Sequence, residues 1–165
     1  SMTVRYANFF PNTKKLHVFA NRGTSGIDGS TSTTVGTALV SEKMNTLITG
    51  DLSFFYDRNA FWNNYIPSNL RIIVLNNHGG GIFRMIEGPT KQEELEPYFI
   101  TKQTLRVKNT AKDFNLAYQF CTNENEVNDA LSTFFEKSKT AKILEIESNT
   151  EINTEIFKNF KSYGI

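Results

Sequence analysis

The chain has very little cysteine and no excess of either charge. Cys121 is the single cysteine in 165 residues, which excludes an internal disulfide and any cysteine-rich zinc site. Eighteen basic side chains balance seventeen acidic ones and leave a formal net charge of +1. A protein that binds phosphate backbones normally carries a basic excess, so general nucleic-acid binding is disfavoured.

Long hydrophobic runs are also missing. The longest wholly apolar run, 72–75, is far shorter than the roughly 20 residues that a membrane helix needs. The first residues lack the apolar stretch of a secretory signal peptide. We therefore expect a soluble, cytoplasmic domain with no membrane contact, long enough to bury one core.

Short apolar, β-branched runs alternate with stretches of helical period. The runs predict strands over 16–20, 47–49, 71–75, 116–120 and 142–146. The periodic stretches predict helices over 2–10, 31–41, 54–65, 126–137 and 151–160. Asn125 is a candidate cap of the fourth helix, and Asn149 or Thr150 of the last. The alternation predicts a three-layer α/β fold, with a mostly parallel sheet and helices on both faces.

One stretch, 87–103, breaks this alternation. It is polar, contains Pro89 and Pro97, and is long for a connection inside a compact domain. We interpret it as either a mobile lid or a loop that a partner orders. No internal repeat or interdomain linker is evident, so residues 1–165 are expected to form one domain.

Three of the predicted strands are followed by unusual loops, and parallel sheets bind ligands at the carboxyl ends of their strands. The first loop has Gly23, Gly26 and Gly29 among hydroxyl side chains, so its backbone N–H groups could hold an anion. The spacing fits neither the dinucleotide fingerprint nor the P-loop. Glycines that serve only to turn the chain tightly remain the alternative.

The second and third loops offer oxygen ligands. Asp51 follows one strand, and a carboxylate there suits a hard divalent cation that also touches phosphate, although it could simply cap a helix. Asn76 and Asn77 follow the next strand, and the glycine triplet 79–81 lets backbone carbonyls approach the same ion. Such ligands suit Mg²⁺ or Ca²⁺, and none is soft enough to select zinc.

Together these loops match a known motif. Gly50-Asp51, followed about twenty-five residues later by Asn76-Asn77, resembles the thiamine-diphosphate motif that starts Gly-Asp and ends Asn-Asn. The third position of that motif is usually glycine, and this chain has Leu52 there.

The loops 21–29 and 79–83 narrow the resemblance to one branch. With Leu52, they are similar to the 2-succinyl-5-enolpyruvyl-6-hydroxy-3-cyclohexene-1-carboxylate synthases of menaquinone biosynthesis, the MenD family. The match is closest over 1–83, and the remainder fits in pattern without a distinctive motif. The resemblance implies the thiamine-diphosphate-binding fold.

The family's domain organisation implies what the chain lacks. Residues 1–165 would be the single C-terminal, diphosphate-binding domain, without the pyrimidine-binding and central domains of the full enzyme. The glutamate that activates the cofactor would come from the pyrimidine-binding domain of a second subunit, in a homodimer or tetramer. We therefore expect the isolated domain to be inactive.

The resemblance also implies the activity of the full-length chain. That enzyme would be a transferase dependent on thiamine diphosphate and Mg²⁺, with Mn²⁺ as a possible substitute. It would decarboxylate 2-oxoglutarate and add the resulting succinyl carbanion to isochorismate.

Carried over by position, the resemblance assigns site residues. The metal ligands would be the side chains of Asp51 and Asn77 and the carbonyl of Gly79. The cofactor-binding set would be Ser25, Gly26, Ile27, Gly50, Asp51, Leu52, Ser53, Asn77, Gly79, Gly80, Gly81 and Ile82. Ile27 would be the apolar wedge beneath the folded cofactor. His78 stands where the family has asparagine, and we expect it to lie outside the metal's ligands.

The substrate-binding residues would be Ser1, Arg5 and Arg22, and the catalytic set Arg22, Ile82 and Phe83. Both implied substrates are dicarboxylates, which the planar fork of arginine suits. Surface ion pairs are the alternative interpretation for both arginines.

Two other functions stay open. The chain could be the matching domain of an acetolactate synthase or a 2-oxoacid decarboxylase, or a non-catalytic α/β module that binds anions. The Arg22 loop and 79–83 argue against the first, because a pyruvate-type substrate needs no second carboxylate clamp.

Overall fold

The computed structural model describes residues 3–4, 15–21, 23–24 and 26–162. The helix expected over 2–10 lies almost wholly outside these residues. Four implied site residues also lie outside them, namely Ser1, Arg5, Arg22 and Ser25.

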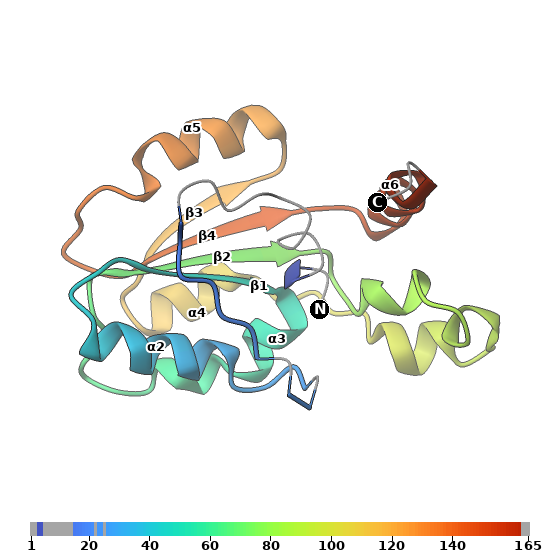
Figure 1. Cartoon of the computed structure of the whole chain (residues 1–165), viewed down its shortest axis with the longest axis horizontal. Helices are drawn as coiled ribbons and strands as arrows, with labels where there is room; N and C mark the ends of the chain where they lie inside the picture. The colour runs from blue at the N-terminus through green and yellow to red at the C-terminus, as the bar shows by residue number, and fades with distance from the viewer. Residues whose placement is uncertain (1–2, 5–14, 22, 25, 163–165) are drawn as a thin grey trace.

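Four parallel strands form one sheet in the order β1-β2-β4-β3 (Figure 1). They are β1 (Asn45–Gly50), β2 (Leu70–Asn76), β3 (Ala117–Cys121) and β4 (Lys142–Glu147). Gly50 pairs with Leu75, and Asn76 pairs with Glu147, so β1, β2 and β4 end at the same edge. This edge carries the candidate site.

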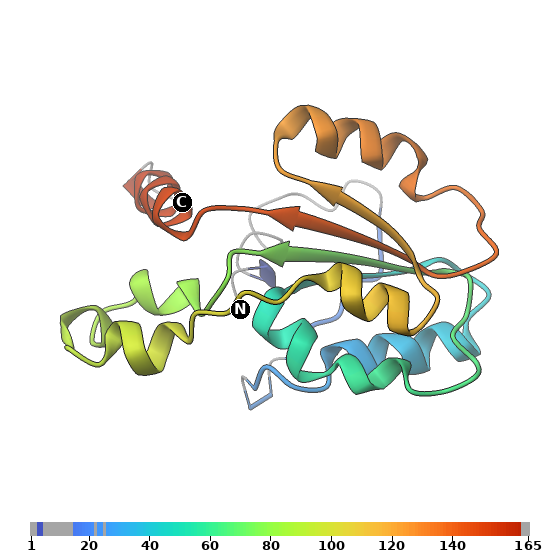
Figure 2. The same cartoon turned by 180° about the vertical axis from the view of Figure 1, so that it is seen from behind.

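Helices cover both faces of the sheet, which confirms the predicted three-layer α/β fold (Figure 2). One face carries α2 (Ser30–Val40), α3 (Asp51–Tyr56) and α4 (Val107–Asp113). The other face carries α5 (Glu124–Phe134). Each face of the sheet packs against its helices through a separate apolar cluster, because successive side chains of a strand point to opposite faces. Ile72 belongs to the larger cluster, whereas Ile73 and Cys121 belong to the smaller one under α5.

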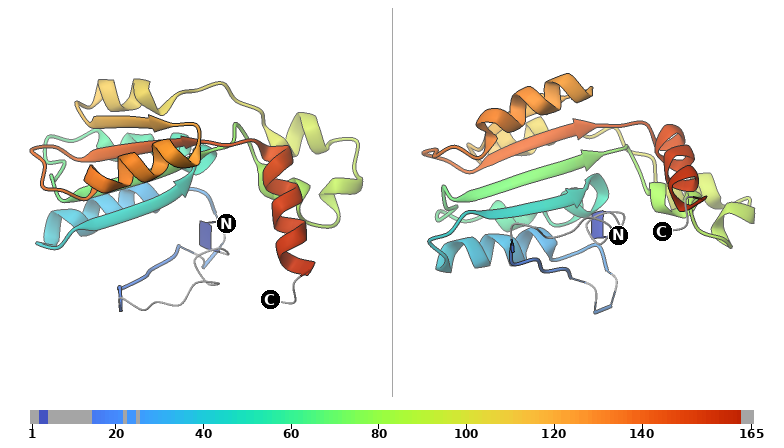
Figure 3. Two further views of the ribbon diagram at one scale, coloured as in Figure 1. Left: turned by 90° about the horizontal axis from the view of Figure 1, so that it is seen from above. Right: turned by 45° about the horizontal axis from the view of Figure 1, so that its top comes forward.

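The last helix, α6 (Thr150–Ser162), lies beyond the carboxyl ends of the strands (Figure 3). It contacts η2 (Gly81–Arg84), a 3₁₀ turn that follows β2. Across the described part of the chain, no helix combines the length and the apolar character needed to cross a bilayer.

The strand predicted over 16–20 is wrong. Residues 15–20 form no strand, and Leu16, Val18 and Phe19 are 65%, 67% and 86% exposed. His17, expected inside a buried strand, is exposed as well. An apolar run becomes a buried strand only where another strand pairs with it, and among the described strands β1 pairs with β2 alone.

The helix predicted over 54–65 is also shorter than expected. It ends at Tyr56, and η1 (Arg58–Phe61) follows as a separate 3₁₀ turn. The break falls at Asp57, whose buried carboxylate accepts hydrogen bonds from Ser32 in α2. Of the aromatic residues predicted on this helix, Phe61 is in the core, whereas Trp62 and Tyr65 are exposed.

The caps of the last two helices were predicted with mixed success. Asn123, and not Asn125, caps α5, since its Oδ1 accepts from the backbone N–H of Glu126 at 3.0 Å. The Asn149 prediction is confirmed, because its Oδ1 accepts from the backbone N–H of Ile152 at 3.0 Å. Helix α4 was not predicted from the sequence.

Candidate functional site

The loops after β1 and β2 lie next to each other at the carboxyl edge of the sheet. Asp51 is the first residue of α3, directly after β1, and Asn77 directly follows β2. Because these two strands are parallel neighbours in the sheet, both side chains come to one edge. Asp51 is only 2% exposed, so a carboxylate is buried at this point.

Three oxygen-bearing groups meet there. One end of the Asn77 side-chain amide lies 3.2 Å from Asp51 Oδ1 and 2.8 Å from the carbonyl oxygen of Gly79. With its NH₂ group in that position, Asn77 donates to both acceptors. With its oxygen there, the Asn77 oxygen lies 3.2 Å from Asp51 Oδ1 and 2.8 Å from the Gly79 oxygen. Both separations are close to the edge of a Mg²⁺ octahedron, about 3 Å for bonds of about 2.1 Å. The donor set therefore fits a hard divalent cation.

Burial dominates the electrostatics of Asp51. It raises the pKa of the Asp51 carboxyl above its ordinary value, and hydrogen bonds from the Gln103 side chain and from the backbone at Leu52 and Gly79 oppose that rise. A bound cation would stabilise the charged carboxylate further.

Gln103 is a member of the site that sequence analysis missed. Its Nε2 donates to Asp51 Oδ2 at 2.8 Å and to Asn76 Oδ1 at 3.0 Å. It lies 27 residues after Asn76 in the chain, at the end of a long excursion. A single glutamine at that distance carries no local sequence signal.

The glycine triplet after β2 allows a close backbone approach. A Cβ on Gly79 would lie 2.7 Å from the carbonyl oxygen of Ile100, and one on Gly80 would lie 2.7 Å from that of Phe99. A Cβ on Gly81 would collide with the Asn77 side chain. Side chains at these positions would therefore displace the facing segment or the Asn77 amide.

That facing segment is 87–103, which we expected to be a mobile lid or a loop ordered by a partner. It forms η3 (Pro89–Lys91) and a turn of π-helix, η4 (Leu95–Ile100). Two backbone hydrogen bonds join it to the triplet loop, from Gly80 N to Ile100 O at 2.6 Å and from Gln103 N to His78 O at 3.2 Å. The segment is thus folded against the site by contacts within the chain.

The first glycine loop reaches the site through α3. Ser53 donates its hydroxyl to the carbonyl oxygen of Ile27 at 2.5 Å. The Ile27 side chain is 46% exposed, and Gly26 beside it is exposed too. Gly50 and Leu52, on either side of Asp51, are half-buried. The structure therefore brings the loop at 26–29 next to the residues that follow β1.

Ile82 and Phe83 lie in η2, directly after the triplet. Both are half-buried, and the Phe83 ring packs edge-on against that of Phe99 with centroids 5.4 Å apart. The Phe83–Phe99 pair therefore joins η2 to η4 beyond the carboxyl edge of the sheet.

His78 is paired through its side chain with Glu147. Its backbone is left-handed, with φ at 60°, and its Nε2 lies 3.1 Å from Glu147 Oε1. Arg106 holds the other oxygen of Glu147 at 2.6 Å. The imidazole of His78 is thus paired with the carboxylate at the end of β4.

A buried network continues from Asn76 into the sheet. Its Nδ2 donates to Glu145 Oε1 at 2.7 Å, and the hydroxyl of Tyr118 donates to Glu145 Oε2 at 2.5 Å. Asn76 and Glu145 are both fully buried. Burial and the adjacent carboxylate raise the pKa of Tyr118, so its hydroxyl remains a donor.

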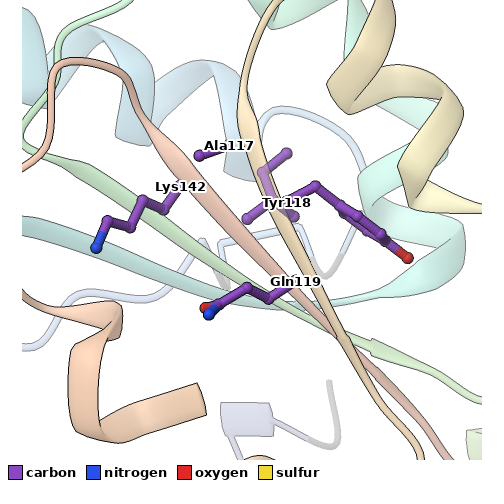
Figure 4. Close-up of a pocket in the computed structure, with 5 residues that line it drawn as sticks. Ala117, Tyr118, Gln119 and Lys142 are labelled. Carbon is purple, nitrogen blue, oxygen red and sulfur yellow. The ribbon is translucent and has the colours of Figure 1, made fainter.

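A separate hollow of about 150 Å³ lies along β3 and β4 (Figure 4). It is lined by Ala117, Tyr118, Gln119, Lys142 and Ile143. Ala117 and Lys142 are the first residues of their strands, so the hollow lies toward the amino ends, away from Asp51. Tyr118 and Lys142 extend to opposite sides in Figure 4. The hollow is not part of the candidate site.

The fold, together with Asp51, Asn77 and the Gly79 carbonyl, defines a class of protein. It is an α/β domain that brings oxygen ligands together where its parallel strands end. No family model matches the chain. Curated relatives do, and all three that follow are named 2-succinyl-5-enolpyruvyl-6-hydroxy-3-cyclohexene-1-carboxylate synthase. The Cytophaga hutchinsonii protein is 58% identical over 98% of this chain, and the Christiangramia forsetii protein is 48% identical over 99%. The Flavobacterium psychrophilum protein is 46% identical over 97%.

By sequence, the chain belongs to the family of these synthases, the MenD family. It spans 29%, 28% and 29% of the lengths of the three relatives, so most of each relative has no counterpart here.

Proposed function

We propose that this chain is the C-terminal, diphosphate-binding domain of a synthase that depends on thiamine diphosphate and Mg²⁺ and acts in menaquinone biosynthesis. The observation that carries the proposal is the meeting of Asp51, Asn77 and the Gly79 carbonyl at the carboxyl edge of the sheet. The names of the relatives support the family and the pathway.

The described residues fit both parts of such a cofactor. Asp51, Asn77 and the Gly79 carbonyl would hold Mg²⁺, the oxygen-ligand cation that commonly bridges to phosphate. Ser53 and backbone N–H groups around Gly26 and Leu52 would hold the diphosphate. The remaining members of the implied cofactor set are Ser25, Ile27, Gly50, Gly80, Gly81 and Ile82. Exposed Ile27 would support the thiamine as its apolar wedge.

When bound, thiamine diphosphate supplies the electron sink that decarboxylation of a 2-oxoacid requires. The protein's part is to orient the substrates and keep the site dry. Ile82 and Phe83 would line the apolar side. Ser1, Arg5 and Arg22 would bind the carboxylates of 2-oxoglutarate and isochorismate, since arginine pairs with them through two parallel hydrogen bonds.

Other parts of the cofactor site would come from outside these 165 residues. A second subunit would supply the pyrimidine-binding domain and the activating glutamate, so the working enzyme would be a homodimer or tetramer. The chain alone would be inactive, because it holds only one half of the cofactor site.

The test is a calorimetric titration of thiamine diphosphate into the full-length synthase, with and without Mg²⁺. Replacing Asp51 by Asn removes the charged ligand while conserving shape. We expect Mg²⁺-dependent affinity to fall at least about 100-fold, beyond the usual effect of losing a residue that only supports a ligand. The matched control is Asp129→Asn, an exposed aspartate on α5, which should bind as the parent does. Undiminished binding by Asp51→Asn would remove Asp51 from the site and refute the proposal.

A further inference from the structure

The side-chain amide of Gln103 has all of its polar atoms engaged. Its Oε1 accepts from the backbone N–H of Leu105 at 2.5 Å. A backbone N–H can only donate, so the amide oxygen must face Leu105 and the NH₂ group must face Asp51 and Asn76. The orientation of the amide is therefore determined by its surroundings.

This orientation divides the two oxygens of Asp51 between two tasks. Oδ2 accepts from Gln103 at 2.8 Å, whereas Oδ1 faces the Asn77 amide at 3.2 Å. Without the Gln103 donor, rotation about the Cβ–Cγ bond could exchange the two oxygens or turn both away from Asn77. Beside the backbone hydrogen bonds from Leu52 and Gly79, Gln103 is the side chain that holds Oδ2 and leaves Oδ1 facing the Asn77 amide.

The other partner of the Gln103 NH₂ group is itself rigid. Asn76 Oδ1 also accepts from the backbone N–H of His78 at 3.1 Å, and Asn76 Nδ2 donates to buried Glu145. The backbone of Gln103 is held as well, since its N–H donates to the His78 carbonyl at 3.2 Å. Gln103 therefore links the end of β2 to the start of α3.

From this geometry we infer that Gln103 is a positioning residue, which fixes the Asp51 carboxylate for a divalent cation. The inference rests on the proposed function, because it takes Asp51 as the ligand. Gln103 would not touch the cation. Residues that orient a ligand in this way typically account for 10- to 100-fold of metal affinity.

The experiment measures Mn²⁺ binding by electron paramagnetic resonance, in the full-length synthase with saturating thiamine diphosphate. Gln103→Met keeps the length of the side chain and removes its hydrogen bonds. We expect Mn²⁺ to bind 10- to 100-fold more weakly. Gln92→Met is the matched control, because Gln92 is an exposed glutamine of the same segment, and it should bind as the parent does. Circular dichroism of the metal-free variants establishes that each is folded at the assay temperature.

The outcomes separate the two proposals. A parent protein that binds no Mn²⁺ in the presence of thiamine diphosphate would overturn the proposed function. A parent that binds, beside a folded Gln103→Met variant whose affinity falls less than tenfold, would overturn the positioning role alone. Gln103→Leu replaces Gln103→Met if the latter does not fold, with the same expected loss.

Discussion

Asp57 and Ser32 are joined by two hydrogen bonds across 25 positions of the chain. The backbone N–H of Ser32 donates to Asp57 Oδ2 at 2.7 Å, and its hydroxyl donates to Oδ1 at 2.6 Å. Ser32 lies in the first turn of α2, whose N-cap, Gly29, has no side chain to accept from that turn. A distant carboxylate thus performs the task of an N-cap residue for α2, and its own residue is the C-cap of α3.

Replacing Asp57 by Asn should lower the free energy of unfolding by about 1–2 kcal/mol, because the amide keeps one acceptor and loses the charge. Urea denaturation followed by circular dichroism measures the change. Asp113→Asn, at the exposed end of α4, is the control and should change stability by less than about 0.5 kcal/mol. Equal stability of the two variants would mean that the Asp57 contacts add nothing to the fold.

Gly80 should not tolerate a side chain. A Cβ there would lie 2.7 Å from the Phe99 carbonyl oxygen, so Gly80→Ala should destabilise the protein by about 1–3 kcal/mol. The variant should also expose the Gly80 amide, which donates to Ile100, to faster hydrogen exchange. Gly36→Ala is the control, since a Cβ at that position of α2 meets nothing within 4 Å. That variant should be as stable as the parent or slightly more so. Parent-like exchange in Gly80→Ala would contradict the close approach.

The start of α5 should make stability depend on acidic pH. The backbone N–H and hydroxyl of Thr122 donate to Glu126 Oε2 at 2.7 and 3.0 Å, and these bonds lower the pKa of Glu126 from 4.5. Because the folded-state pKa lies below the unfolded one, the stabilisation is complete above pH 4.5 and is lost as pH falls through the folded value. Glu126→Gln keeps an acceptor without the titration. We expect its melting temperature to lie below that of the parent at neutral pH, and the difference to shrink as pH falls below 4.5. A difference that is constant with pH would contradict the assignment.

The strands of the sheet could largely be predicted because a short apolar run in the sequence marks a strand that the sheet buries. β2 is buried at all but one position, as a run of isoleucine, valine and leucine predicts for a parallel strand covered on both faces. The run at 16–20 has a similar composition and is exposed, because composition does not reveal whether a partner strand exists. For α4 the signal was weak, since Val107 is the only large apolar residue among the buried positions of that helix.

The residues of the candidate site also fall into those that could be predicted from the sequence and those that could not. Asp51 and Asn77 could be placed together from sequence, because each directly follows a strand and the two strands are neighbours. Gln103 could not, because only the folded path of 87–103 returns it to the end of β2. The break of α3 at Asp57 was equally hidden, since the carboxylate at that position bonds to Ser32 in another helix.

Two backbone hydrogen bonds close the base of the long segment that connects β2 to α4. The backbone N–H of Gly80 donates to the carbonyl of Ile100, and that of Gln103 donates to the carbonyl of His78. The chain therefore enters and leaves this segment at one place. Residues 87–94 lie on the far side of these two crossings from the ends of the strands. Insertions or deletions at 87–94 should therefore leave the positions of Asp51 and Asn77 unchanged, so that this stretch is free to diverge in length while the chemistry at its base is retained.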